Sequence, residues 1–138
     1  MEERQIIRAG EIAQDMMGAI CDGDEEAIKE GFPREIREYC EQGEILDGME
    51  VHRLKAELMQ EAGIDETSFF YKKIGIRIGS GEQECDEEVP ETEKCSVLFQ
   101  IGKPFWQGHM GWPFSIDLCL EEEEWKLDES WIREYLLR

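Results

Sequence analysis

The stretch F-S-I-D-L-C-L-E-E-E-E-W-K-L, residues 114–127, decides the fold of this chain. Apolar residues occupy every second position from 114 to 120, which is the period-2 pattern of a strand with one buried face. The four consecutive glutamates at 121–124 predict a hairpin turn, and Trp125-Lys126-Leu127 predicts a short strand that returns from it. A strand, a tight turn and a second strand together predict antiparallel pairing.

Two segments upstream show the same alternation. Residues 70–78 alternate apolar and polar side chains, and so do residues 95–101, so we expect two more strands of the same sheet. The side chains expected on the buried face of the first of these strands are Phe70, Ile74, Ile76 and Ile78. Leu98 interrupts the alternation in the second strand and predicts that this strand is covered on both faces.

The first 63 residues carry helical patterns instead, with apolar residues three and four positions apart. The expected helices cover about residues 4–21, 25–30, 33–43 and 48–62. Asp24 is placed to cap the second helix, and Gly63 is placed to stop the fourth. After the last strand, apolar residues at 131, 132, 135 and 136 predict a closing helix capped by Ser130.

Helices first and antiparallel strands second is the order of an α+β fold. The expected architecture has N-terminal helices packed on one face of a curved, mainly antiparallel sheet of about four strands, with a C-terminal helix. The length of 138 residues suits one domain, residues 1–138, and is too short for two conventional ones.

The chain is strongly acidic, with 34 Asp and Glu against 15 Lys and Arg, a net charge of −19. Phosphate backbones and anionic membranes are bound through positive charge, so direct binding to nucleic acid or to a membrane is not expected. No window reaches the ~18 consecutive apolar residues of a membrane span. Because acidic residues occur in both halves of the chain, the charge favours a basic protein as partner.

Five cysteines, at 21, 40, 85, 95 and 119, are odd in number and lack the spacing of zinc ligands. The first residues, Met-Glu-Glu-Arg, are the opposite of the basic start of a signal peptide. We therefore expect a cytoplasmic protein whose thiols are reduced and act as small buried apolar side chains. Neither a metal site nor a cofactor is expected.

The sequence contains no catalytic motif. The two histidines are His52, expected near the surface of a helix, and His109. A cluster of His109, Asp117 and Cys119 stays open as an alternative, because Asp117 and Cys119 share one face of a strand. Nothing indicates an activated thiol, so we expect a protein that is not an enzyme.

Two irregular segments interrupt the strands. Residues 82–93 hold seven acidic residues and no basic one. Residues 104–114, P-F-W-Q-G-H-M-G-W-P-F, are rich in aromatic residues and glycine. The aromatic side chains either fill the open end of the sheet or form an exposed binding site anchored by tryptophan. The candidate partner-binding residues are Phe105, Trp106, His109, Trp112, Asp86, Glu87 and Glu88.

Two short motifs carry a resemblance to a known superfamily. G-D-E-E-A at 23–27 introduces the second helix, and W-K-L-D at 125–128 follows the acidic turn. With the long first helix, they resemble the NTF2-like (cystatin-like α+β) superfamily, whose domains often carry GD-x-x-A and W-K-I-D. The resemblance implies a cone-shaped α+β fold whose concave face binds a small molecule or a partner. It implies no particular activity and no catalytic residue.

The function expected first is that of a small cytoplasmic acidic protein that binds and neutralises a basic protein partner. Immunity proteins and anti-defence inhibitors are the classes that use an acidic surface in this way. The alternative is an NTF2-like domain that binds a small molecule, with or without enzymatic activity. A homodimer remains open for both functions.

Overall fold

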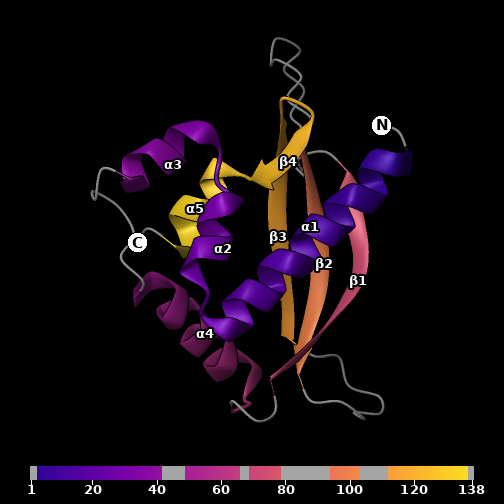
Figure 1. Ribbon diagram of the computed structural model, residues 1–138. Coiled ribbons are helices and arrows are strands. Elements are labelled where there is room, and N and C mark those ends of the chain that lie inside the picture. Colours follow the sequence, from indigo (N-terminus) through magenta and orange to yellow (C-terminus); the bar gives the residue numbers. More distant parts are fainter. Residues whose placement is uncertain (1–2, 42–48, 66–68, 79–93, 103–111, 137–138) are drawn as a thin grey trace.

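The computed structural model describes residues 3–41, 49–65, 69–78, 94–102 and 112–136, and the structural statements below concern these ranges. In chain order the elements are α1 (Glu3–Asp22), α2 (Glu25–Glu30), α3 (Arg34–Glu41), α4 (Met49–Ala62), β1 (Phe70–Ile78), β2 (Lys94–Gly102), β3 (Trp112–Glu121), β4 (Glu124–Leu127) and α5 (Glu129–Tyr135). The predicted α+β fold is confirmed, with helices before a curved antiparallel sheet and one helix after it (Figure 1).

The strands lie in the order β1-β2-β3-β4, and each is antiparallel to the next. In the central pair, Phe99 of β2 stands opposite Phe114 of β3. The hairpin between β3 and β4 turns through Glu122 and Glu123, whose φ angles are 52° and 69°. Two positive φ angles in succession define a type I′ turn, so the predicted hairpin at the four glutamates is confirmed.

The main core lies between α1 and one face of the sheet, which α1 crosses (Figure 1). The fully buried side chains of this face, each 0% exposed, are Val97, Phe99, Ile101, Ile116 and Leu118. On the helix, Gly10 allows a close approach, because a Cβ there would stand 2.8 Å from Nζ of Lys73 and 3.5 Å from Cδ1 of Ile76. Small residues on this side of α1 thus set its distance from β1.

The prediction that Phe70, Ile74, Ile76 and Ile78 share one buried face of β1 is wrong. The side chains of Phe70, Ile74 and Ile78 are 46%, 51% and 48% exposed, and Ile76 is half-buried. The pairing with β2 shifts between Lys73 and Gly75, so Ile74 is the extra residue of a β-bulge. Because side chains alternate with a period of two, this extra residue turns Phe70 and Ile76 to opposite faces of the sheet.

The C-terminal segment covers the part of the β3 edge that β4 leaves open. β4 pairs with residues 118–121 only. Beyond that point the backbone N–H of Asp128 donates to the carbonyl of Asp117, at 2.9 Å. The indole N–H of Trp131 donates to the carbonyl of Ser115, at 2.8 Å. These two bonds fix α5 beside β3.

Asp128, and not Ser130, caps α5. The Asp128 carboxylate accepts a hydrogen bond from the backbone N–H of Ser130, at 3.2 Å, and α5 begins at Glu129. Asp128 has extended backbone angles that continue the direction of β4, and Lys94 lies 3.3 Å from its carboxylate. Ser130 is also a good capping residue, but these tertiary contacts place the helix start two residues earlier.

The predicted cap of α2 at Asp24 and the predicted stop of α4 at Gly63 are confirmed. The carboxylate of Asp24 accepts a hydrogen bond from the N–H of Ala27, at 3.2 Å, and caps α2. Gly63 follows the last residue of α4 with φ of 70°, a conformation that glycine adopts at little cost.

Trp125 joins the N-terminal helix to the last strand. Its indole N–H donates to the carbonyl of Gln5, 120 residues away in the sequence, at 2.9 Å. Nearby, the N–H of Leu127 donates to the carbonyl of Gly31, at 2.6 Å. β4 is therefore held by Gln5 of α1 and by Gly31, which follows α2, as well as by β3.

Candidate functional site: a groove between α4 and β3

A groove of about 680 Å³ lies between α4 and the first residues of β3. The residues that line it are Leu54, Glu57, Leu58, Gln60, Glu61, Leu98, Trp112, Pro113, Phe114, Ser115 and Tyr135. Leucine and aromatic side chains make up most of this lining, and a pocket with that composition favours an apolar or aromatic occupant. Leu98 of β2 is half-buried and belongs to this lining.

The pattern of α4 explains why this helix supplies one wall. Leu54 and Leu58 stand four residues apart and are 1% and 4% exposed, so they hold the helix against the core. Glu57 and Glu61 each follow one of these leucines by three residues, and residues three apart are neighbours on a helix surface. The helix therefore places two carboxylates beside its buried leucine stripe.

The opposite wall is held by contacts between α5, β3 and α4. The ring of Tyr135 packs edge-to-face on Phe114, with centroids 5.3 Å apart and an interplanar angle of 81°. Trp131 lies 5.2 Å from Tyr135 in the same aromatic cluster. The guanidinium of Arg53 donates to the carbonyl of Tyr135, at 3.3 Å, and joins α4 to the end of α5.

The rim of the groove is negative. Of the eleven lining residues, two are acidic and none is basic. Glu57 lies 3.9 Å from Nε of Arg53, whereas Glu61 is exposed and forms no ion pair within the described ranges. A cation that enters the groove would meet the carboxylate of Glu61, which no described cation neutralises.

Trp112 is the candidate site residue that the structure describes. It is 40% exposed, stands opposite Ile101 in the sheet and lines the groove. Phe114, from the same aromatic segment, is 6% exposed and fills the core. The remaining candidates, Phe105, Trp106, His109, Asp86, Glu87 and Glu88, lie outside the described residues.

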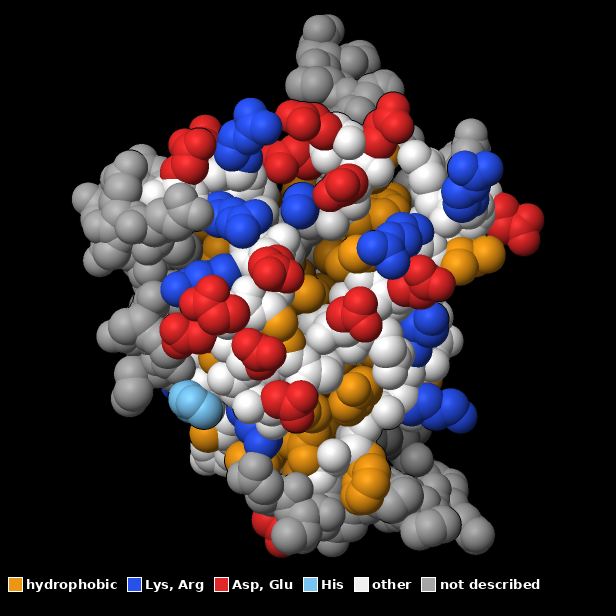
Figure 2. Space-filling view, in the orientation of Figure 1, with side chains coloured by type: hydrophobic (Ala, Val, Ile, Leu, Met, Phe, Trp, Pro, Cys, Tyr) orange, Lys and Arg blue, Asp and Glu red, His pale blue; other side chains and the backbone are white. Residues whose placement is uncertain are grey.

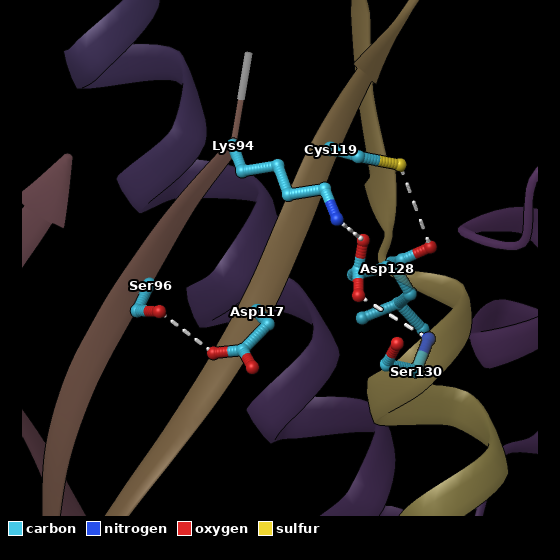
Figure 3. A network of polar contacts seen from close by, with 7 residues as sticks. Lys94, Ser96, Asp117, Cys119, Asp128 and Ser130 are labelled. Atoms are coloured by element: carbon cyan, nitrogen blue, oxygen red, sulfur yellow. Dashed lines mark hydrogen bonds and ion pairs between the residues drawn. The ribbon is translucent and has the colours of Figure 1, made fainter. Parts of the chain in front are cut away.

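A second cluster, of polar side chains, lies on the face of the sheet opposite α1 (Figure 3). Nζ of Lys94 is 3.3 Å from the carboxylate of Asp128, and Oγ of Ser96 donates to the carboxylate of Asp117, at 2.8 Å. Each carboxylate has a partner, and Asp128 also caps α5, so these contacts serve the packing of α5 on the sheet.

The thiols near this cluster are poor nucleophiles. Burial, together with the carboxylates of Asp128 and Glu121, raises the pKa of Cys119 to about 11. Burial likewise raises the pKa of Cys95 to about 12, with a contribution from Asp117. A thiol that stays protonated at neutral pH does not attack an electrophile. This argues against nucleophilic use of Cys119, although Asp117 and Cys119 do share one strand face.

The described ranges contain neither a metal-binding cluster nor a membrane-spanning helix. No three His, Cys, Asp or Glu side chains there converge in a way that would hold a metal ion. None of the helices in these ranges combines the length and the apolar character that crossing a bilayer requires.

Glu57, Glu61 and Tyr135 line the groove but were not predicted as site residues from the sequence. The signal for the glutamates was present, because they flank Leu54 and Leu58 at helical spacing. Nothing local could have placed α4 beside the start of β3, since about fifty residues separate Leu58 from Trp112.

The chain was compared with protein-family models, with curated proteins and with solved structures, and none of these comparisons finds a match.

Proposed function

We propose that this protein binds a basic protein partner through the groove between α4 and β3 and thereby inhibits that partner. The observation that carries the proposal is the lining of the groove, with leucines and aromatic rings, two carboxylates on the rim and no cation. An apolar segment that presents a lysine or arginine complements this lining, because its cation would pair with the carboxylates of the rim and its apolar side chains would pack on the leucines and aromatic rings.

Two further features support binding of this kind. Trp112 exposes 40% of its surface at the groove, and a tryptophan that becomes buried at an interface is a common anchor of affinity. The net charge of −19 attracts a basic protein from a distance and speeds its association. The groove would provide the specific contacts, and the overall charge would provide a fast rate of association.

The test is capture of a partner by the immobilised protein, followed by comparison of variants. A basic protein captured by the wild type should be lost with W112A and with E57Q/E61Q, and its retention should fall as salt rises from about 50 to about 300 mM. W112A should remain folded, because Trp112 is the first residue of β3 and 40% of its surface is exposed.

The matched control is E35Q/E38Q on α3, which removes the same charge from exposed positions away from the groove. The proposal requires that E35Q/E38Q retain the partner. Equal loss with both double variants would assign the binding to overall charge and reject the groove. Binding that does not respond to salt would also count against it.

A second candidate function is the binding of a small molecule, as the resemblance to NTF2-like domains implies. The volume of the groove, about 680 Å³, is within the range of small-molecule sites, and its lining is partly aromatic. Organic cations would suit the aromatic rings and the carboxylates best. A ligand that raises the melting temperature of the wild type and not of W112A would favour this function over protein binding.

We place the interaction in the cytoplasm. Cys95 and Cys119 carry free thiols, which persist in a reducing compartment. Immunity proteins and anti-defence inhibitors remain the classes closest to the proposed mode of action.

A further inference from the structure

β1 forms one edge of the sheet and carries the opposite charge to the rest of the molecule. Within the described ranges it pairs with β2 alone. It contains three basic residues, Lys72, Lys73 and Arg77, and no acidic one, in a chain with a net charge of −19. All three are exposed, and none forms an ion pair or hydrogen bond with another described residue. Lys and Arg side chains are seen along this margin, over β1 and the start of α1 (Figure 2).

The same margin exposes apolar side chains. Of the five large hydrophobic residues that the structure describes as exposed, three belong to β1 and one to α1. They are Phe70 at 46%, Ile74 at 51%, Ile78 at 48% and Ile7 at 56%. Ile7 precedes Gly10 by one helical turn, and Gly10 faces Ile76, so this part of α1 runs along β1. Exposed apolar side chains along a sheet edge are suited to contact with another molecule.

The charge of β1 selects against a second copy of this strand. Pairing β1 with itself would bring six cations together without an anion, and cations on an edge strand protect it from such self-association. The bulge at Ile74 adds to this protection, because continuous pairing is limited to the four residues on either side of it. A short acidic segment avoids the charge repulsion that a second copy of β1 would meet.

We propose that the β1 edge binds a short, extended acidic segment of a partner protein, which adds to the sheet as a further strand. Backbone hydrogen bonds to the free edge would supply part of the affinity, as in other cases of strand addition. Carboxylates on one side of the segment would pair with Lys72 and Arg77, which share the sheet face opposite α1. Its apolar side chains, on the other side, would meet Ile76 and Ile78, which stand opposite Val97 and Cys95. This site is separate from the groove, since β1 and β3 are separated by β2.

The test uses a fluorescent peptide of about ten residues that alternates glutamate with valine, the pattern of a strand with one charged side. Fluorescence anisotropy at low salt should show saturable binding to the wild type. K72Q/K73Q/R77Q should weaken this binding by at least about tenfold, because the charge pairs with Lys72 and Arg77 and the positive charge of Lys73 beside them are removed. The same peptide methylated on alternate backbone nitrogens should not bind, since it cannot complete the edge hydrogen bonds.

W112A and E57Q/E61Q serve as matched controls that should bind the peptide like the wild type, so the result does not depend on the groove. Several results would overturn the inference: no binding of the peptide, equal binding of its methylated form, or undiminished binding to K72Q/K73Q/R77Q. Sedimentation that reveals a wild-type dimer assembled through β1 would overturn it in favour of a second copy. Binding to phosphatidylserine vesicles without binding to the peptide would overturn it in favour of an anionic membrane.

Discussion

The turn between β3 and β4 offers a direct test of how backbone strain enters the stability of this protein. Glu122 and Glu123 are held at φ of 52° and 69°, a region that residues with a Cβ occupy at a cost. The double substitution E122N/E123G keeps a type I′ turn and installs the pair that such turns favour most. We expect the variant to be more stable than the wild type.

The expected gain follows from three contributions. Relief of two positive φ angles contributes about 2 kcal/mol, and the added freedom of glycine in the unfolded chain takes back about 0.5 to 1 kcal/mol. The ion pair between Glu122 and Arg34 is lost, but at 3.7 Å with both side chains 72% exposed it contributes little. The net gain is about 1 kcal/mol, which corresponds to a rise of roughly 3–6 °C in melting temperature.

Urea denaturation and thermal unfolding, each followed by circular dichroism, measure this gain. The control is E122Q/E123Q, which removes the same two charges but keeps both side chains at positive φ. This control should stay within about 0.5 kcal/mol of the wild type. A gain in E122Q/E123Q as large as that of E122N/E123G would refute the reasoning, because relief of charge repulsion, and not of backbone strain, would then explain the effect.

Three further predictions concern the bulge, the cap of α5 and the buried thiol. Deletion of Ile74, the unpaired bulge residue, should leave the unfolding free energy within about 1 kcal/mol. Deletion of Ile76 removes the bulge as well but places Gly75 opposite Val97, so the loss of that apolar side chain should cost about 2 kcal/mol. Urea denaturation compares the two, and equal losses contradict the assigned bulge. D128A removes the cap of α5 and the ion pair with Lys94, and its unfolding free energy in urea denaturation should fall by about 1.5 kcal/mol. D128N keeps a capping side chain and should lose only about 0.5 kcal/mol. Equal losses in the two variants would rule out a capping role. The pKa of Cys119 is about 11 in the folded state against an ordinary value of 9.0, so the unfolded state releases the thiol proton first as the pH rises. The unfolding free energy should therefore fall between pH 9 and pH 11, and it should fall less in C119A. The same pH dependence in C119A and the wild type would argue against the raised pKa.

Much of the fold could be predicted because its signals are local. The alternation in residues 95–101 and 114–120 reports directly which side chains are buried, and both strands formed with that face inward. Asp24 and Gly63 act within a few residues of their own position, and both ended or began helices as predicted. The four glutamates turned the chain although none is a preferred turn residue, since the flanking strands required it.

The errors arose where distant contacts decide between local alternatives. In β1, the apolar residues at 70, 74, 76 and 78 indicated one buried face, but a single extra residue in the ladder moved Ile74 out of register. At α5, Ser130 was the predicted cap, but contacts with the neighbouring strand place the cap at Asp128. The groove depends on the meeting of α4 with β3, so its glutamates gave a helix signal without indicating a site.

The hydrogen bond between Trp125 and Gln5 constrains the order in which this protein can mature during translation. The carbonyl of Gln5 leaves the ribosome long before the indole that will contact it, at a separation of 120 residues. Until β4 has been synthesised, α1 lacks that partner, although β1, β2 and β3 are already available to pack against it. Truncated nascent chains that end before residue 125 should therefore be more sensitive to proteases than the full chain.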